Sequence, residues 1–511
     1  MPNPRERDSV GRNVSVVFAG QVVTWLTTAV TLAIIPRYLG AHDMGVYSIG
    51  MTFVAVATAM GGMGMGTLIT RDVARDRVGW SELVSSALWL NLGLGVVAGI
   101  ATVAVAWAAG YTTAIIIVVA LLAATVPLSL FGTVIGATFT GLEIMRWNVA
   151  IDIANKVLFL ISAIIALTFD LGLAGLVVAS LACSVAIFLA QFMVVAKRFG
   201  IEMKGVSLKL LKYLLRNSTP FFMVSMAWVL YTSIDVFMLS WLGEEESVGI
   251  YATPMRIFGT ALFVPITVTT ALFPRLSAVF AESSNEMARI SGRVLRVSVS
   301  VSILMALVSV TLSDPVVVSM LGKSFAEDTG PVVLALSVSL VPTSISIVAS
   351  RMAFAANRQS AVAWIGFSAF AGKAALGFLL IPFFNAEFGN AALGAAVVLL
   401  AAESAMVLAM LRFLPDGTFA YSGSYYRRLG LATSVAVCAC VIGYGRSPLG
   451  ASFSAVACYV VLLVLLRLLG PSQVRTAIEF VSRRAAPDAS PLGPPGGPVP
   501  ALAEPEGLGL R

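Results

Sequence analysis

The chain has 511 residues, of which 58% are hydrophobic and only 12% are charged, and its mean hydropathy is +0.93. Soluble domains are about a quarter charged, and a large soluble core does not explain the deficit because single cores stop growing well below this length. The composition therefore excludes an ordinary soluble protein and predicts an integral membrane protein. The formal net charge is +7, but the basic residues lie between hydrophobic runs, which excludes a nucleic-acid-binding face and is typical of loops beside a membrane.

The chain begins with Arg5, Arg7 and Arg12, followed by an apolar run that reaches Tyr38. This run is too long for the core of a cleaved signal peptide, so we interpret it as a retained spanning helix. A helix needs about 20 apolar residues to cross the hydrocarbon, and about fourteen runs of the chain qualify. Helices are the expected spanning form because lipid offers no partner for backbone amides. The predicted spans are Val14–Tyr38, Val46–Thr70, Leu83–Ala108, Thr113–Thr138, Trp147–Phe169, Leu171–Ala196, Pro220–Leu242, Val248–Leu272, Val294–Leu312, Pro331–Ser350, Ala361–Phe383, Ala391–Phe413, Gly430–Tyr444 and Ala451–Leu469.

Positive residues alternate between loops. Even-numbered loops between the predicted helices carry 19 Lys and Arg residues, whereas odd-numbered loops and their edges carry only Arg37, Lys323 and Arg446. Basic loops stay on the cytoplasmic side, so both termini are expected in the cytoplasm and the acidic run Glu244-Glu245-Glu246 is expected outside. The sequence thus predicts a multi-pass protein of the cell membrane.

The segment between the sixth and seventh spans and the C-terminal tail are not spanning. Val206–Asn217 places leucines on one side and basic residues on another, which predicts a short amphipathic helix in the inner headgroup layer. The tail is rich in Pro and Gly and lacks hydrophobic runs, which favours disorder. The expected organisation is a cytoplasmic N-terminus (1–12), an N-terminal six-helix bundle (13–200), the linker helix (201–217), a C-terminal six-helix bundle (218–415), two peripheral spanning helices (416–470) and a disordered cytoplasmic tail (471–511).

The two halves share a spaced motif. Gly45-Val46-Tyr47 precedes Arg71, and Gly249-Ile250-Tyr251 precedes Arg275, each at a distance of 26 residues from glycine to arginine. The offset of about 204 residues covers an even number of helices, so both copies enter the membrane in the same direction. Parallel repeats of this kind enclose a substrate site between the halves in one class of transporters. The alternative is that the motif is a common turn of helical hairpins.

Each half of the chain contains a set of distinctive motifs. They are Pro36-Arg37-Tyr38-Leu39-Gly40, Met44-Gly45-Val46-Tyr47-Ser48 and Leu68-Ile69-Thr70-Arg71 in the first half, and Ile234-Asp235, Gly249-Ile250-Tyr251 and Leu272-Phe273-Pro274-Arg275-Leu276 in the second. These motifs resemble those of the polysaccharide flippases of the multidrug/oligosaccharidyl-lipid/polysaccharide exporter superfamily. The resemblance covers about residues 10–470. It implies an all-α membrane fold of two six-helix bundles around a central cavity plus two peripheral helices. It also implies export of a polyprenyl-diphosphate-linked oligosaccharide from the cytoplasmic to the outer leaflet by alternating access.

Charged residues are rare inside the predicted spans, where they cost about 2.5–3.5 kcal/mol each and normally face a cavity or a partner. The candidates are Asp152, Lys156, Asp235, Arg256, Lys373 and Glu403, with Arg37 near the outer end of the first span. Arg256 is the first choice for a substrate contact because a guanidinium binds a phosphate through two parallel hydrogen bonds. Pairing with Asp235 is its alternative role.

Lys156, Lys373 and Arg37 are further candidates for binding an anionic substrate. Asp152 lies one helical turn before Lys156, so pairing between them is the alternative. Asp235, Glu403 and Asp152 are candidates for ion coupling or ion pairing, with Glu403 as a proton carrier or as the partner of Lys373.

The second predicted span contains four closely spaced glycines, Gly61, Gly62, Gly64 and Gly66. Glycine permits bending and close approach of backbones, so these residues are candidate hinge positions, with static packing as the alternative. Arg71 and Arg275 occupy matched inner ends and are candidate gate residues, with headgroup anchoring as the alternative.

No catalytic or metal-binding set is visible in the sequence, and no cofactor is predicted. His42 is the single histidine, and the four cysteines have no metal-ligand spacing. Two other functions compete with the flippase: an ion-coupled multidrug exporter of the same superfamily, and a membrane glycosyltransferase or polymerase. The expected partners are a lipid-linked anionic oligosaccharide, membrane lipids, and glycosyltransferases or a polymerase of the same pathway.

Overall fold

The computed structural model describes most of the membrane portion of the chain. The described residues are 10–75, 80–199, 207–262, 265–266, 269, 284–311, 321–322, 325, 328–356, 358–414, 418, 423–444, 448–466 and 468. Arg275, residues 1–9 of the predicted N-terminal segment and the predicted tail 471–511 lie outside them. So do residues 201–206 of the predicted linker.

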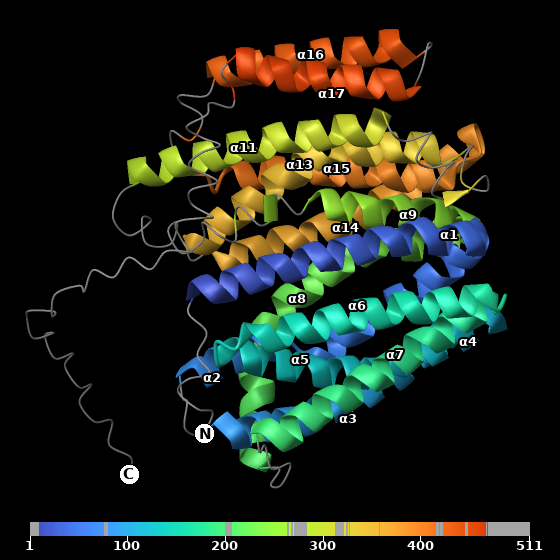
Figure 1. Cartoon of the computed structure of the whole chain (residues 1–511), viewed down its shortest axis with the longest axis vertical. Coiled ribbons are helices and arrows are strands. Elements are labelled where there is room, and N and C mark those ends of the chain that lie inside the picture. Colours follow the sequence, from blue (N-terminus) through green and yellow to red (C-terminus); the bar gives the residue numbers. More distant parts are fainter. Residues whose placement is uncertain are drawn as a thin grey trace, which may run out of the picture.

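The N-terminal half consists of long helices that run nearly side by side, in the lower part of Figure 1. Its helices are α1 (Val10–Gly62), α2 (Met65–Arg75), α3 (Trp80–Ala108), α4 (Thr113–Ala123), α5 (Thr125–Gly141), α6 (Met145–Thr168) and α7 (Gly172–Val194), which continues into a π-helical turn at Val195–Phe199. Helix α1 reaches across to the second half and packs against α8 and α9 as well as α6.

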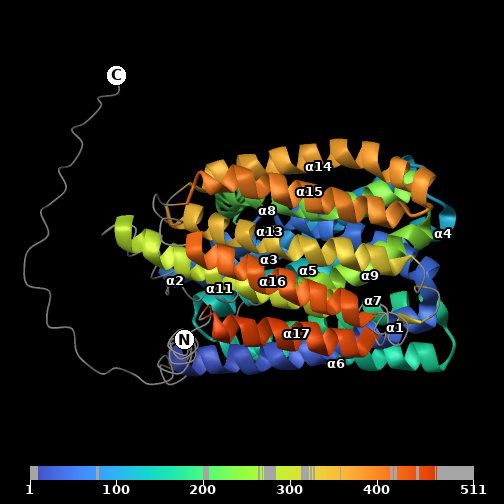
Figure 2. The ribbon, with the colours of Figure 1, turned by 90° about the horizontal axis from the view of Figure 1, so that it is seen from above.

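The C-terminal half and a separate helix pair follow. The helices of the half are α8 (Leu208–Leu242), α9 (Glu245–Ala261), α11 (Ser284–Thr311), α13 (Thr329–Ala355), α14 (Gln359–Phe388) and α15 (Ala391–Leu411). The pair α16 (Gly423–Tyr444) and α17 (Pro448–Leu465) packs on α11 at the edge of the molecule. Figure 2 shows from above that most of these helices run nearly parallel.

The predicted all-α membrane fold is confirmed. Each of the predicted spans contains a helix of the structure. Eleven helices in the described part are long and apolar enough to cross a membrane, and Phe453–Leu465 is a shorter apolar helix. Large apolar side chains such as Trp107, Leu379 and Ile442 are more than 60% exposed, which suits a surface that lipid surrounds.

Glycines and a proline interrupt the spans at defined places. The first two predicted spans join at Gly40, whose backbone is left-handed in φ (75°) and extended in ψ (176°), a conformation that a Cβ would strain. The second predicted span breaks after Gly62, where Met63 and Gly64 have φ of 44° and 68°. The fourth breaks at Ala124 between α4 and α5, shortly before Pro127.

The predicted amphipathic linker helix is not separate from the seventh span. Helix α8 runs from Leu208 to Leu242 without a break, and Pro220 lies inside it. Its first turns are amphipathic, with Leu208 largely exposed and Leu214 fully buried. Pro220 has no backbone N–H to donate within the helix, and α8 nevertheless continues on both sides of it.

One hydrophobic cluster joins the two halves. It includes Met44 and Ile49 of α1 together with Met238 of α8, Val248 of α9 and Leu399 of α15, all nearly inaccessible. A second cluster lies in the N-terminal half and includes Leu214 from the start of α8, and a third lies between the C-terminal half and the α16–α17 pair. The halves are therefore in apolar contact, and the functional groups must be sought along this contact and inside each half.

Candidate functional site

The two halves cross most tightly where α1 meets α9, here named the α1–α9 end. A Cβ at Gly45 would overlap the carbonyl oxygen of Glu245, and a Cβ at Gly249 would overlap the carbonyl oxygen of Ala41. Each member of one contact lies 204 residues from its counterpart in the other, which is the offset of the sequence repeat. The contact is thus reciprocal, as expected for two similar halves facing each other across a pseudo-two-fold axis.

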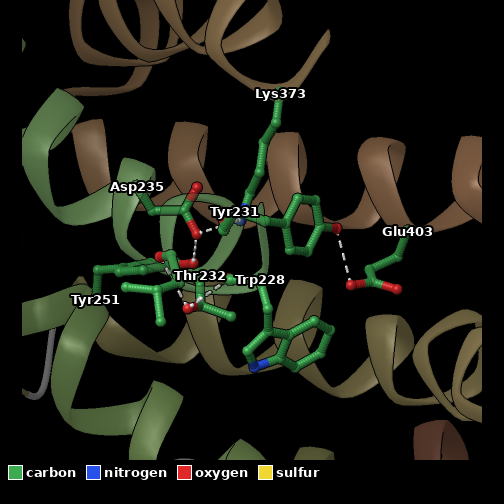
Figure 3. A network of polar contacts seen from close by, with 8 residues as sticks. Trp228, Tyr231, Thr232, Asp235, Tyr251, Lys373 and Glu403 are labelled. Carbon is green, nitrogen blue, oxygen red and sulfur yellow. Dashed lines mark hydrogen bonds and ion pairs between the residues drawn. The ribbon is translucent and has the colours of Figure 1, made fainter. Parts of the chain in front are cut away.

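A buried polar network lies next to this crossing, within the C-terminal half (Figure 3). Lys373 Nζ of α14 lies 2.7 Å from Asp235 Oδ2 of α8 and donates to the carbonyl oxygen of Tyr231 at 3.0 Å. The hydroxyl of Tyr251 on α9 donates to the same carboxylate oxygen at 2.5 Å. The side chains of Lys373 and Asp235 are 1% and 3% exposed, so the ion pair is almost completely buried.

Tyr231 extends the network toward α15. The ring centroid of Tyr231 is 4.4 Å from Lys373 Nζ, and its hydroxyl donates to Glu403 Oε1 at 2.8 Å. The second carboxyl oxygen, Glu403 Oε2, is buried and has no hydrogen-bond partner in the described part of the chain. Glu403 Oε2 therefore has unused capacity to accept a proton or a hydrogen bond.

The ion pair of the structure differs from both ion pairs that were considered from the sequence. Asp235 pairs with Lys373 and not with Arg256, and Lys373 pairs with Asp235 and not with Glu403. Sequence reasoning missed Tyr231 and Tyr251, which complete the network. Tyr251 belongs to the repeated Gly-x-Tyr motif, so the repeat itself was a signal that this hydroxyl has a structural partner.

Arg256 lies between the halves. It projects from α9, is half-buried, and its guanidinium carbon is 5.7 Å from the ring centroid of Tyr47 on α1. Tyr47 is the repeat counterpart of Tyr251, and its hydroxyl is 3.4 Å from Ser180 Oγ. Among the residues that the structure describes, no carboxylate lies within ion-pair distance of Arg256.

The remaining charged candidates lie elsewhere. Asp152 and Lys156 are on α6, form no ion pair with each other within the described residues, and Asp152 borders a cavity inside the N-terminal half. Arg37 is exposed at the corner where α1 turns, close to Gly322. The structure therefore brings Asp235, Lys373 and Glu403 together and leaves Asp152, Lys156 and Arg37 apart from them.

At the opposite end the halves touch through α2 and α8, here named the α2–α8 end. Tyr213 of α8 donates to Asp72 Oδ2 at 2.9 Å, and Arg71 pairs with Asp72 Oδ1 at 2.8 Å while lying over the ring of Phe221. The hydrogen bond to Asp72 raises the pKa of Arg71, so its guanidinium remains charged. A Cβ at Gly64 would lie 2.6 Å from the backbone of Phe221, so a glycine is needed for this approach.

The other candidate hinge glycines face the N-terminal half. Cβ atoms at Gly61 and Gly62 would lie 2.7 and 3.0 Å from methyl carbons of Leu130, and one at Gly66 would lie 3.3 Å from Thr133. Within the described residues, no group of three His, Cys, Asp or Glu side chains is suited to hold a metal ion.

Comparison with solved structures shows the fold that this arrangement defines. The chain matches a structure described as lipid II flippase MurJ in an inward closed conformation, with a TM-score of 0.73, 13% identity, and coverage of 88% of this chain and 99% of that one. An inward-facing multidrug resistance MATE family transporter of the MOP superfamily matches with a TM-score of 0.64, 15% identity, and coverage of 79% and 96%. An outward-facing structure described in the same words matches with a TM-score of 0.55, 16% identity, and coverage of 80% and 97%.

These likenesses define a multi-pass membrane protein with the fold of the multidrug/oligosaccharidyl-lipid/polysaccharide exporter superfamily. A family model described as polysaccharide biosynthesis protein matches residues 10–280, more than half of the chain. The chain belongs to this family. A sequence comparison with curated proteins gives no match. The fold of this family member is similar to that of the solved flippase and transporters.

Proposed function

We propose that this protein carries a polyprenyl-diphosphate-linked oligosaccharide from the cytoplasmic to the outer leaflet of the cell membrane, by alternating access of two halves. The polysaccharide biosynthesis family supports a glycan substrate, and the two-half fold supports transport. Both termini are proposed to be cytoplasmic because the basic loops alternate with the spans. The export would supply surface polysaccharide or glycan synthesis, alongside the glycosyltransferases or polymerase of that pathway.

The observation that carries the proposal is the position of Arg256. A cation inside a membrane protein is normally balanced by a carboxylate, as Lys373 is by Asp235. Arg256 instead lies across the contact between the halves with an aromatic ring as its described neighbour. A guanidinium in this position offers paired donors to a phosphate, which an ammonium group cannot match geometrically.

The other cations take secondary roles in the proposal. Lys156 is half-buried on α6 and Arg37 lies exposed at the α1 corner, and each would add positive potential along the path of an anion. Lys373 is held by Asp235 in this conformation. It would contact substrate only in a conformation that opens this pair.

Glu403 is the proposed coupling group. Its carboxyl group is 3% exposed, accepts one hydrogen bond from Tyr231 and has a second oxygen without a described partner. Protonation at this oxygen would change the charge beside the Asp235–Lys373 pair and so bias the packing of α8, α14 and α15. Asp152 and Asp235 are the further candidates for coupling. Transport by liposomes under an imposed pH gradient should lose its dependence on the gradient in Glu403→Gln and keep it in Asp152→Asn if Glu403 carries the proton.

The proposal is tested by flipping in proteoliposomes that contain a fluorescent prenyl-diphosphate-linked sugar, with the outer leaflet quenched by a membrane-impermeant reductant. Loss of a charged hydrogen bond costs about 1.5–3 kcal/mol, so Arg256→Ala should slow flipping about ten- to a hundredfold. Arg296→Ala is the matched control, since Arg296 also lies over a tyrosine ring, 5.4 Å from the centroid of Tyr425, but away from the contact between the halves.

Two results would contradict the assignment. The flippase function would be wrong if the wild-type protein did not accelerate flipping above protein-free liposomes. The role of Arg256 would be wrong if Arg256→Ala and Arg296→Ala flipped the lipid at the same rate as wild type.

A multidrug exporter is the second candidate, favoured by the match to a multidrug transporter with a TM-score of 0.64. Such a protein would use buried carboxylates to bind cationic drugs, and Asp235 and Glu403 are buried here. Cells that express the wild-type protein should then resist cationic drugs and lose the resistance with Asp235→Asn. Equal drug sensitivity with and without the protein would exclude this function.

A further inference from the structure

A polar cavity of about 550 Å³ lies inside the N-terminal half, between α1, α5, α6 and α7. Its volume is within the range of small-molecule sites, about 300–1,000 Å³. The cavity is distinct from the buried network of the C-terminal half and from Arg256, since none of those residues borders it. The hydrogen-bonding residues on its wall that matter here are Ser129, Asn148, Asp152, Asn155, Ser184 and Gln191.

Some of these groups are already satisfied within the fold. Asn148 donates to the carbonyl oxygen of Gly136 at 2.9 Å and to Thr140 Oγ1 at 3.0 Å, and Ser184 donates to the carbonyl oxygen of Ser180. Asn148 therefore holds the wall formed by α5 and α6 in place. These residues shape the cavity. The polar groups on its wall without a hydrogen bond inside the protein define what it binds.

The polar groups on the cavity wall without a hydrogen bond inside the protein are mainly amides. Gln191 is only 7% exposed and lines the cavity, yet its side chain makes no hydrogen bond with the described part of the chain. The amide nitrogen of Asn155 is also unused, because only its oxygen accepts, from Cys183 Sγ at 3.3 Å. Gln191 therefore offers an amide oxygen and an amide nitrogen to a ligand in the cavity, and a buried ligand gains free energy from pairing with such groups.

The chemistry of the wall selects the ligand. No Lys or Arg is among the described residues that line the cavity, which disfavours a phosphate group there. A lone carboxylate, Asp152, stands among several amide and hydroxyl groups. This mixture of donors and acceptors matches a group that carries many hydroxyls and no charge, because each hydroxyl donates and accepts at once.

The cavity is near one end of the bundle. It is bordered by Gly136 close to the end of α5, Met145 at the start of α6 and Gln191 close to the end of α7. This is the end that loop charge predicts to face the cytoplasm. Thr133 borders both this cavity and a second one beside Arg71, so the two hollows share a wall.

We propose that this cavity receives the sugar headgroup of the lipid-linked substrate, with Gln191 and Asn155 as its amide contacts and Asp152 as an acceptor for sugar hydroxyls. The inference rests on the proposed function and deepens it. The cavity of the N-terminal half binds the sugar, whereas Arg256 at the contact between the halves binds the diphosphate.

The test compares two kinds of probe on the purified full-length protein. One is farnesyl diphosphate, and the other is farnesyl diphosphate linked to N-acetylglucosamine, glucose or galactose. Wild type should bind at least one sugar-bearing probe about tenfold more tightly than the bare one. Gln191→Leu and Asn155→Leu should each weaken binding of that probe about three- to tenfold, as for one lost hydrogen bond, and leave binding of the bare probe unchanged.

Two further variants separate this effect from misfolding. Gly132→Ala should crowd the Gln191 amide from the backbone side, because its Cβ would lie 3.0 Å from Gln191 Oε1, and should weaken only the sugar-bearing probe. Asn385→Leu, at an exposed asparagine of α14, is the matched control and should change neither affinity. Unfolding temperatures of all variants report on folding.

The outcomes distinguish the two proposals. If wild type binds the bare and all sugar-bearing probes equally, or if the Gln191 and Asn155 variants keep the preference for sugar, the cavity is not the sugar site. If wild type binds none of the probes, the proposed function itself is contradicted. Arg256→Ala should weaken both kinds of probe, because the diphosphate is common to them.

Discussion

At the scale of single residues, the fold places a complete ion pair in an environment where charge is costly. Asp235 and Lys373 are nearly inaccessible, and further hydrogen bonds join the pair to the hydroxyl of Tyr251 and to the carbonyl oxygen of Tyr231. A buried pair needs such additional partners, because the attraction between the charges alone does not offset their lost hydration. Removing one partner therefore leaves a buried charge without compensation.

We predict that Lys373→Met destabilises the protein by about 3–5 kcal/mol, and that Asp235→Asn does so by a similar amount. The double variant Asp235→Asn, Lys373→Met should recover much of this loss, because it leaves no unpaired charge. Unfolding by heat or denaturant in detergent measures the free energy of unfolding of the wild type, both single variants and the double variant. Strict additivity of the two single effects would show that the two residues are not energetically coupled.

At the scale of helices, the crossing of α1 and α9 is set by two glycines. The carbonyl oxygens of Glu245 and Ala41 occupy the space that Cβ atoms at Gly45 and Gly249 would need. Helices approach this closely only where one of them lacks a side chain. If the halves rock apart during transport, this crossing is the contact that has to open and close at the α1–α9 end.

We predict that Gly45→Ala and Gly249→Ala each shift the protein toward conformations open at the α1–α9 end and slow flipping about tenfold or more. The added methyl group overpacks the contact when it is closed, which costs about 1–3 kcal/mol, and it has no such cost when the contact is open. Spin labels at His42→Cys and Glu246→Cys, both exposed, measure the separation of the helices. Gly93→Ala is the control, because no atom lies within 4 Å of its Cβ position. An unchanged label distance in Gly45→Ala would show that the close contact is not a gate.

The α2–α8 end has a weaker connection of a different kind. The hydrogen bond from Tyr213 to Asp72 is on a partly exposed surface and links the two halves. Tyr213→Phe removes this bond and keeps the ring, so the closed state should lose about 0.5–1.5 kcal/mol. The expected result is a two- to tenfold rise in labelling of Leu214→Cys, which is fully buried in the closed contact, by a thiol reagent, with Tyr38→Phe at the opposite end as control. Equal labelling in both variants would contradict a latch at this position.

At the scale of the whole molecule, the fold can be compared with the orientation that the basic loops predict. Helix ends that the loop charges assign to opposite sides of the membrane should lie at opposite ends of the bundle. The corner between α14 and α15 and the end of α7 lie at opposite ends of the bundle in this arrangement. With both termini cytoplasmic, Glu387 is expected outside and Lys197 inside, and both residues are exposed.

We predict that a membrane-impermeant maleimide labels Glu387→Cys in intact cells and labels Lys197→Cys only after the membrane is permeabilised. Cys183, Cys438, Cys440 and Cys458 are free in the structure, so they are first replaced by alanine. The reverse pattern would invert the proposed orientation and with it the proposed direction of transport.

The sequence by itself determined the membrane class, the helical fold, the positions of the spans and the identity of the few charges inside them. These follow from local properties: the length of an apolar run, the cost of a charge in lipid, and the spacing of a repeat. The resemblance of short motifs to a family added the two-half architecture. None of this required knowledge of which helices touch.

Only the tertiary structure decided which of the charges meet. Lys373 and Asp235 are 138 residues apart, and the partners considered for both from the sequence were other residues, because no local pattern shows which helices face each other. The same holds for the reciprocal contact of Gly45 and Gly249 and for the polar cavity around Gln191, whose wall comes from four helices. Pairing and cavities depend on distances between distant segments, and packing alone fixes those distances.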